Sequence, residues 1–243
     1  MQRDVLFQNP QKTIGDFNFG QQTAAVFDDM LERSIPQYRE LQRMIGEIAA
    51  KFAVTDTHIY DLGCSTGITL ETIDHAVSNR VILIGVDYSQ PMLDKARERF
   101  LELGSTKPVE WMCADLNKKL RIDNASVVLL NLTLQFVRPL YRQTLIRSIY
   151  EGLNPNGCLI LVEKVLGNDS LFNRLFIEFY YEMKQRNGYS TTEISQKRES
   201  LENVLIPYRT DENIELLKGG GFEHVEQFFK WYNFCGFLAV KQP

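Results

Sequence analysis

The amino-acid sequence predicts an α/β protein in which a mostly parallel, seven-stranded sheet is covered by helices on both faces. Three observations lead to this prediction. Residues 54–77 read as a strand, a glycine turn and a helix. Apolar strand-like runs and helical spacings then alternate as far as residue 163, which is typical of parallel sheets. Residues 222–241 read as two closing strands joined near Tyr232 and Asn233, an antiparallel hairpin at the edge of the sheet.

The remaining elements follow in order along the chain. Residues 1–20 hold aromatic anchors among polar residues, which indicates an irregular arm packed over another part of the molecule. Two helices complete the N-terminal segment 1–53, one over 22–33 and one ending at Phe52, with Tyr38 in its first turn. The alternating core is predicted to contain strands at 57–62, 80–86, 108–113, 126–130 and 157–163, and helices at 68–77, 90–103 and 139–152.

The bulk composition indicates a single domain over residues 1–243. Hydrophobic residues make up 44% and charged residues 24% of the chain, which is ordinary for a soluble globular enzyme. The net charge of −4 argues against direct nucleic-acid binding through a strong positive field. Four scattered cysteines and three isolated histidines lack metal-ligand spacing, so no metal is expected. With neither a signal segment nor a membrane span visible, we expect a cytoplasmic protein.

The glycine turn is the first candidate binding element. In YDLGCSTG, Gly63 and Gly67 flank the small residues Cys64, Ser65 and Thr66, directly after a strand and before a helix. Such a turn is expected to bring free backbone N–H groups to the carboxyl end of the strand, where Gly63 lets a ligand approach the backbone. The pattern lacks the third glycine of dinucleotide-binding turns and the Gly-Lys-Ser/Thr of phosphate-binding loops.

Acidic residues end the next two strands. Asp87 ends the second strand, where an acid accepts the two hydroxyls of a ribose; alternatively, it caps the helix that begins at Gln90. Asp115 ends the third strand and is a second candidate acid for a binding site; alternatively, it only forms a turn. Asn131 follows the fourth strand and can position a substrate, but no His or Lys near it in the sequence supplies a general base.

From residue 168 the alternation stops, and 168–206 reads as a helical insertion, for which we expect a role in active-site cover and dimerisation. The aromatic helix over 171–183 is most simply a core helix, and its wide apolar coverage would also suit a dimer interface. Lys197 and Arg198 would ordinarily lie on a solvated helix face, paired with nearby glutamates.

The glycine turn and the acid after the second strand resemble the first two motifs of the class I S-adenosylmethionine-dependent methyltransferase fold, a Rossmann-like fold. A more specific resemblance covers essentially the whole chain. Taken in order, eight segments are similar to the carboxy-S-adenosyl-L-methionine synthase family: RDVLF, GDFNF, MLERSIPQY, YDLGCSTG, NLTLQF, YEGLNPNG, NGYSTTEISQKRESLENV and WYNFCGFLAVK.

This resemblance implies a reaction, a ligand set and partners. S-adenosyl-L-methionine and prephenate would give carboxy-S-adenosyl-L-methionine and phenylpyruvate, and a tRNA carboxymethyltransferase would use the product on a wobble uridine. A homodimer is implied, with Arg198 near its interface. Arg198, facing the added carboxylate, and Tyr38 are the catalytic candidates. The implied ligand positions are Tyr38, Gly63, Cys64, Ser65, Asp87, Tyr88, Asp115, Leu116, Asn131 and Arg198.

Two other functions stay open from the residues alone. The first is an S-adenosylmethionine-dependent methyltransferase acting on tRNA or a small molecule. It would need a basic docking surface or a substrate base, and neither is visible in the sequence. The second is a non-catalytic protein that binds S-adenosylmethionine. The intact Gly63, Asp87 and Asp115 argue against such a non-catalytic protein, although they leave a nucleoside sensor open.

Overall fold

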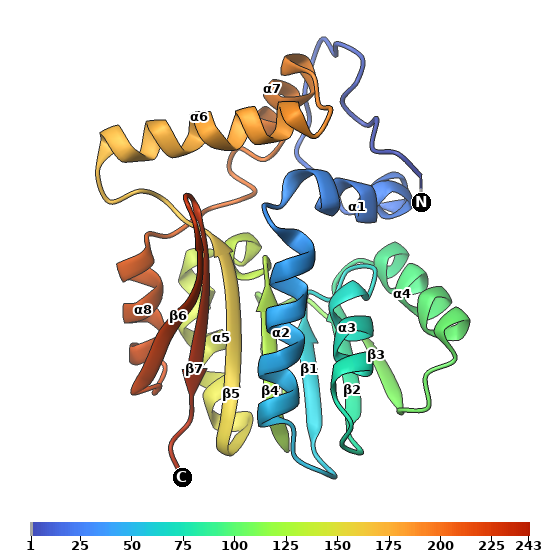
Figure 1. The fold of residues 1–243 in the computed structure, drawn as a ribbon, viewed down its shortest axis with the longest axis vertical. Helices are drawn as coiled ribbons and strands as arrows, with labels where there is room; N and C mark the ends of the chain where they lie inside the picture. The colour runs from blue at the N-terminus through green and yellow to red at the C-terminus, as the bar shows by residue number, and fades with distance from the viewer. Residues whose placement is uncertain (1) are drawn as a thin grey trace.

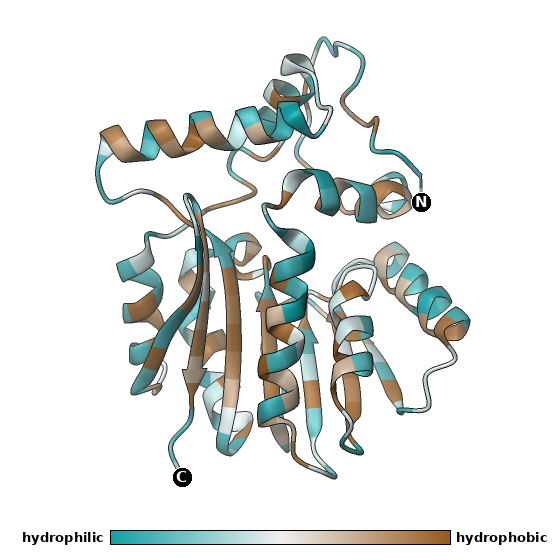
Figure 2. Cartoon of the chain, viewed as in Figure 1, coloured by the Kyte–Doolittle hydropathy of each residue, from teal (hydrophilic) through white to brown (hydrophobic). Residues whose placement is uncertain are grey.

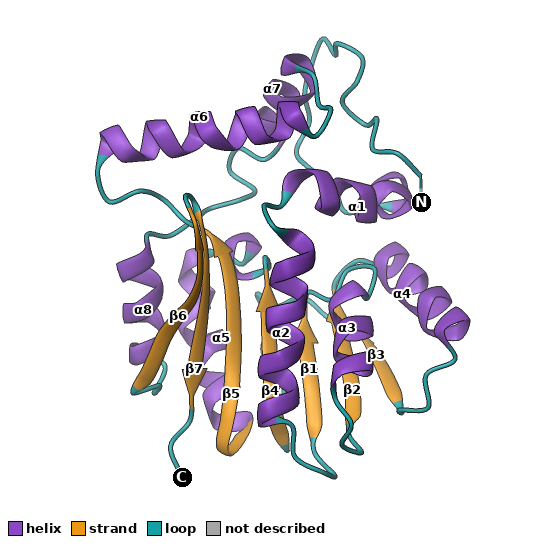
Figure 3. Ribbon diagram, viewed as in Figure 1, coloured by secondary structure: helices purple, strands orange, loops and turns teal. Residues whose placement is uncertain are grey.

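A computed structural model describes residues 2–243 of the chain. Its centre is one seven-stranded sheet with the strand order β3-β2-β1-β4-β5-β7-β6 (Figure 3). The first five strands are parallel, and β6 and β7 run antiparallel at one edge. The strand bounds are His58–Leu62 (β1), Ile82–Asp87 (β2), Val109–Cys113 (β3), Ala125–Asn131 (β4), Leu153–Lys164 (β5), His224–Trp231 (β6) and Phe234–Val240 (β7).

Helices cover both faces of this sheet (Figure 1). Side chains from α2, α3 and α4 pack with one set of strand residues, and side chains from α5 and α8 pack with the alternate set. The predicted fold class is therefore confirmed. The helix bounds are Gln21–Ser34 (α1), Tyr38–Phe52 (α2), Ile68–Ala76 (α3), Gln90–Leu103 (α4), Pro139–Gly152 (α5), Ser170–Arg186 (α6), Thr191–Ser200 (α7) and Thr210–Gly219 (α8).

The central strands show why the sequence folds this way. Residues 125–130 in β4 are all buried, as expected for a strand with neighbours on both sides and helices on both faces. The strand β5 starts four residues earlier than predicted, at Leu153, because its first residues pair with β4 across a register shift next to Ala125. The sheet thus aligns the carboxyl ends of β1, β2, β4 and β5 along one edge.

A separate layer lies across that edge. The N-terminal arm, α1, α6 and α7 form it, above the carboxyl ends of the parallel strands in Figure 1. The helix α6 differs from the predicted core helix, since only Tyr180, Met183 and Lys184 are buried on it. Leu171 and Phe172 near its start are 63% and 53% exposed, and Figure 2 shows apolar residues along this helix.

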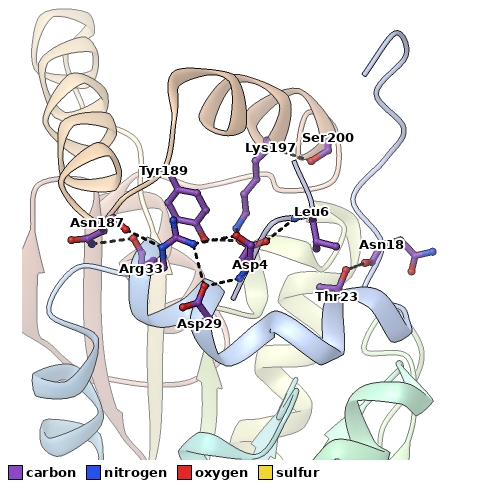
Figure 4. A network of polar contacts seen from close by, with 10 residues as sticks. All are labelled: Asp4, Leu6, Asn18, Thr23, Asp29, Arg33, Asn187, Tyr189, Lys197 and Ser200. Atoms are coloured by element: carbon purple, nitrogen blue, oxygen red, sulfur yellow. Dashed lines mark hydrogen bonds and ion pairs between the residues drawn. The ribbon is translucent and has the colours of Figure 1, made fainter. Parts of the chain in front are cut away.

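Polar contacts join the parts of this layer (Figure 4). The Tyr189 hydroxyl donates to Asp4 Oδ2 at 2.6 Å, and the backbone N–H of Asp4 donates to Asp29 Oδ2 at 2.7 Å. The guanidinium of Arg33 lies 3.8 Å from the centre of the Tyr189 ring and donates to the carbonyl of Asn187. The arm, α1 and the loop before α7 are therefore held together through residues that are far apart in the sequence.

Two features are absent from residues 2–243. None of the helices within that range is long and apolar enough to cross a membrane. Within the same range, no three His, Cys, Asp or Glu side chains gather in a way that could hold a metal ion.

Candidate active site

A cavity lies between the carboxyl edge of the sheet and the covering layer. It encloses about 1380 Å³, including its opening to solvent. Nine of the ten predicted ligand positions line it: Tyr38, Gly63, Cys64, Ser65, Asp87, Tyr88, Asp115, Leu116 and Asn131. The sheet brings eight of these positions together because they end or follow strands whose carboxyl ends share one edge, and Tyr38 joins them from the start of α2.

The turn after β1 takes its shape from three backbone angles. Gly63, Ser65 and Gly67 have φ values of 84°, 48° and 82°, in the left-handed region. A Cβ atom on Gly63 would lie 2.4 Å from the side chain of Thr133, which follows β4. Position 63 therefore requires glycine on two counts, a left-handed backbone and a close approach between two loops.

The backbone N–H groups of this turn are largely used within the protein. The N–H groups of Gly63 and Cys64 donate to the carbonyl of Val86, at 2.7 and 3.0 Å. The Gly67 N–H donates to the Cys64 carbonyl at 2.9 Å, and the Ser65 N–H donates to a side chain of β2. These bonds fasten the turn to β2, so the expectation of free N–H groups fails for Gly63, Cys64, Ser65 and Gly67. The N–H groups of Thr66, Ile68 and Thr69 have no acceptor within residues 2–243. The turn forms a cavity wall mainly through its shape.

Asp87 is the residue that holds the turn. Its Oδ2 accepts the Ser65 N–H at 3.0 Å, and its Oδ1 accepts the Ser89 N–H at 2.8 Å. Burial raises the pKa of this carboxyl, and the backbone hydrogen bonds oppose that change. The cap of α4 is Ser89, whose hydroxyl accepts the Met92 N–H. The alternative role of Asp87 as the helix cap is thus excluded, and its carboxylate faces the cavity.

Acceptor atoms without donors gather beside the turn. Within residues 2–243, Oε1 of Gln42, Oδ1 of Asp61 and Oδ1 of Asn131 are buried and have no hydrogen-bond partner. The amide nitrogens of Gln42 and Asn131 both donate to Oγ1 of Thr69, at 3.2 and 3.0 Å. Burial, followed by the nearby charge of Asp87, raises the pKa of Asp61 to about 7. Such a cluster suits a ligand that brings N–H donors and positive charge.

The sequence alone did not indicate Gln42, Asp61 or Thr69 as members of this cluster. Of the three, only Thr69 is among the residues that line the cavity. A buried acid inside the β1 strand was the available signal, because a carboxylate is rarely fully buried without a partner. Tyr38, at the start of α2, is buried beside Gln42, and burial raises the pKa of its phenol.

The other end of the cavity follows β3. The carboxylate of Asp115 accepts the Asn117 N–H at 2.9 Å and the Asn117 side-chain amide at 2.8 Å, which lowers its pKa. Asp115 therefore does form a turn, and it also lines the cavity. Phe19 of the arm lies over this end, with its ring centre 6.1 Å from Tyr88 and 5.1 Å from Phe136.

Arg198 is the predicted position that does not line the cavity. It is exposed on α7, whereas Lys197 is buried and lines the cavity. The predicted solvated face was wrong for Lys197, because α7 turns Glu193, Ile194, Gln196 and Lys197 inward as one helix face. The adjacent Arg198 falls outside that face.

Two lysines that are far from Asn131 in the sequence lie at the site. Lys164, the last residue of β5, and Lys197 both line the cavity. Burial lowers the pKa of each to about 8. Lys164 comes directly after the buried run 157–163 of β5, in which the apolar residues 158–162 are followed by Glu163. A lysine at the end of a buried strand was the signal in the sequence.

Comparisons with known proteins agree with this architecture. A family model described as "Methyltransferase domain" matches residues 59–157. An O-methyltransferase family protein from Burkholderia thailandensis superposes with a TM-score of 0.66 at 14% identity, over 95% of this chain and 65% of that one. Human N-acetylserotonin methyltransferase superposes with a TM-score of 0.59 at 15% identity, over 92% of this chain and 56% of that one. The fold is that of the class I methyltransferases.

Curated relatives narrow this class. The chain is 56% identical to carboxy-S-adenosyl-L-methionine synthase of Methylococcus capsulatus, over 99% of this chain and 100% of the relative. It is 43% identical to the synthase of Actinobacillus succinogenes over the same shares. The chain belongs to the carboxy-S-adenosyl-L-methionine synthase family.

Proposed function

We propose that this enzyme converts S-adenosyl-L-methionine and prephenate into carboxy-S-adenosyl-L-methionine and phenylpyruvate. One observation carries the proposal. The methyltransferase model matches only residues 59–157, whereas the synthase relatives match over 99% of the chain. The additional matched length includes the arm, α1, α6 and α7, which form the cover of the cavity.

The cavity divides naturally between the two substrates. Asp87 would accept the ribose hydroxyls, and Asp115 with Leu116 would hold the adenine, near Phe19. The methionine end would then reach the buried acceptors around Thr69, where Asp61 and Asn131 offer oxygen atoms to an ammonium group. The second substrate would occupy the rest of the cavity, toward β5 and α6.

The proposed reaction balances without a base from the protein. The ring carboxyl carbon of prephenate forms a bond to the methyl carbon of the sulfonium and breaks its bond to the ring. The ring hydroxyl leaves, its departure completes the aromatic ring of phenylpyruvate, and it takes a methyl proton to give water. The enzyme's part is to hold the two substrates together and keep bulk water out.

The test is mass analysis of reaction mixtures. Purified protein with S-adenosylmethionine and prephenate is expected to yield carboxy-S-adenosylmethionine and phenylpyruvate in equal amounts. Mixtures lacking either substrate serve as controls. Methyl transfer to an added acceptor, without the carboxylated product, would instead support a methyltransferase. Absence of any reaction, together with no nucleoside extracted from the purified protein, would support a scaffold.

We further propose that the enzyme works as a cytoplasmic homodimer. The exposed apolar side chains of Leu171, Phe172 and Tyr232 support an interface along α6. The product would be consumed by a tRNA carboxymethyltransferase that modifies a wobble uridine. The net charge of −4 supports an enzyme that hands over a small molecule and does not itself bind the tRNA.

A further inference from the structure

One basic side chain in the cavity has no carboxylate to balance it. The ammonium group of Lys164 forms no ion pair and no hydrogen bond with any of residues 2–243. Its Nζ lies 4.9 Å from the centre of the Tyr180 ring. Desolvation alone lowers its pKa to about 8. An ammonium group in this setting lacks the anion that a buried charge normally requires.

The surroundings add positive charge to this end of the cavity. Lys184 Nζ lies 5.7 Å from the centre of the same Tyr180 ring. Burial, followed by the charges of Lys197 and Lys164, lowers the pKa of Lys184 to about 7. Lys197 Nζ lies 3.9 Å from Asp4 Oδ2. Lys197 thus has a carboxylate partner. Lys184 forms no ion pair with residues 2–243, and it does not line the cavity.

The acids near these lysines are already engaged. Asp4 accepts the Tyr189 hydroxyl and lies beside Lys197, and Asp29 pairs with Arg33 at 3.2 Å. The Glu193 carboxylate accepts the backbone N–H and the hydroxyl of Ser190 in the capping box of α7. Lys164, Lys184, Lys197 and Arg33 thus share three carboxylates. Of the two lysines among them that form no ion pair with residues 2–243, Lys164 is the one that lines the cavity.

The sheet order indicates which substrate Lys164 meets. The cofactor positions follow β1, β2, β3 and β4, whereas Lys164 ends β5, the next strand beyond β4. Asn131 at the end of β4 pairs with Val162, so Lys164 lies two residues farther along its strand. Neighbouring strands are about 4.8 Å apart, which sets Lys164 beyond the methionine end of the cofactor. Aromatic walls from Tyr180 and Phe234 line this part of the cavity.

We propose that Lys164 binds a carboxylate of the second substrate, the one that is not transferred, while Tyr180 and Phe234 hold the six-membered ring. This inference rests on the proposed function. The choice of carboxylate follows from the chemistry. A carboxyl group that leaves its ring loses negative charge, so a cation bound to it would stabilise the substrate more than the transition state. A cation on the retained carboxylate positions the substrate without that cost, and the same carboxylate remains in phenylpyruvate.

The first test measures binding and needs no turnover. Phenylpyruvate and its methyl ester are titrated into wild type and Lys164→Met in the presence of S-adenosylhomocysteine. We expect the acid to bind wild type at least tenfold more tightly than the ester, and Lys164→Met to lose that preference. Lys164→Arg should keep part of it. Lys218→Met, which removes an exposed lysine on α8, is the matched control and should keep all of it.

Several outcomes would overturn the inference. Equal binding of phenylpyruvate and its methyl ester to wild type would contradict the role of Lys164. This comparison needs no variant, so it remains decisive if Lys164→Met fails to fold. Unchanged acid binding by a folded Lys164→Met would contradict that role as well. A variant whose turnover number falls while its KM for prephenate is unchanged would instead assign proton transfer to Lys164. Failure of the proposed function has a different signature. Wild type would then bind phenylpyruvate more tightly than its methyl ester but would form no carboxy-S-adenosylmethionine.

Discussion

The carboxylate of Asp87 accepts the backbone N–H of Ser65 at 3.0 Å, which joins the end of β2 to the turn after β1. The same carboxylate accepts the Ser89 N–H through its other oxygen, at 2.8 Å. One side chain therefore shapes two loops and also faces the cavity in which the ribose is proposed to bind. Any change at Asp87 is expected to affect the ligand and the protein together.

The first prediction is that Asp87→Ala weakens S-adenosylmethionine binding by about tenfold or more. A hydrogen bond to a charged group contributes about 1.5–3 kcal/mol, and the ribose contacts would be lost with the carboxylate. Calorimetric titration checks the affinity, and urea unfolding reports the accompanying loss of stability. Unchanged affinity in a folded variant would leave Asp87 with a loop-holding role alone.

The second prediction concerns Gly63. In Gly63→Ala the new Cβ would meet Thr133 at 2.4 Å, at a backbone φ of 84°. We expect the turn to shift and S-adenosylmethionine binding to be lost, with a destabilisation above the roughly 1 kcal/mol that the left-handed backbone alone costs. Gly104→Ala is the matched control, because its φ is 64° and nothing lies within 4 Å of the new Cβ. Equal effects at the two glycines would contradict the close approach.

The third prediction is a pH dependence that Asp61 introduces. Burial raises its pKa from 3.8 to about 7, so between these values the folded protein holds a proton that the unfolded chain releases. The contribution of Asp61 to stability is therefore present at low pH and is lost as the pH rises through about 7. The side chain of Asp61→Asn is neutral at every pH. Between pH 3.8 and about 7, the free energy of unfolding of this variant should therefore rise relative to wild type, by up to about 4 kcal/mol.

Urea unfolding of wild type and Asp61→Asn at pH 4.5, 6 and 7.5, without ligand, measures this difference. The stability of Asp61→Asn relative to wild type should increase with pH. A difference that stays constant over the three values would show that Asp61 does not hold a proton in the folded protein.

The fourth prediction concerns assembly. Phe172→Glu should turn the proposed homodimer into a monomer, because it places a charge on the exposed apolar part of α6. Leu101→Glu on α4 is the control, since Leu101 is 82% exposed and lies on a different element. Light scattering at micromolar concentration gives the mass. A wild-type monomer under these conditions would remove the proposal.

The fifth prediction separates the two interpretations of Arg198. If a second copy brings Arg198 to the added carboxylate, Arg198→Ala should weaken carboxy-S-adenosylmethionine binding at least tenfold and leave S-adenosylmethionine binding nearly unchanged. Lysine should rescue poorly, because it lacks the planar fork of the guanidinium. Arg147→Ala, an exposed change on α5, is the control. No loss for either ligand would make Arg198 an ordinary surface residue.

The sequence predicted the sheet and most of the site because both depend on local patterns. A buried run followed by Asp87 or Asp115 defines the carboxyl end of a strand wherever the rest of the chain lies. The burial of Lys197 could not be predicted in this way, since it depends on Asp4 from the other end of the chain. Its neighbour Arg198 looks the same in the sequence, and only the direction of the α7 face distinguishes them.

The hydrogen bond between Tyr189 and Asp4 has a consequence for how ligands enter and leave. The bond joins residues that are 185 positions apart in the sequence, so forming it closes a long loop of the chain. Because the bond joins the N-terminal arm to the loop before α7, we expect these two parts of the cover to open together in one local unfolding event. Hydrogen exchange should find α7 and the arm opening at a lower free energy than β4, and nucleoside release should occur at that opening rate. Exchange of both regions at the β4 rate would show that the cover opens only when the whole molecule unfolds.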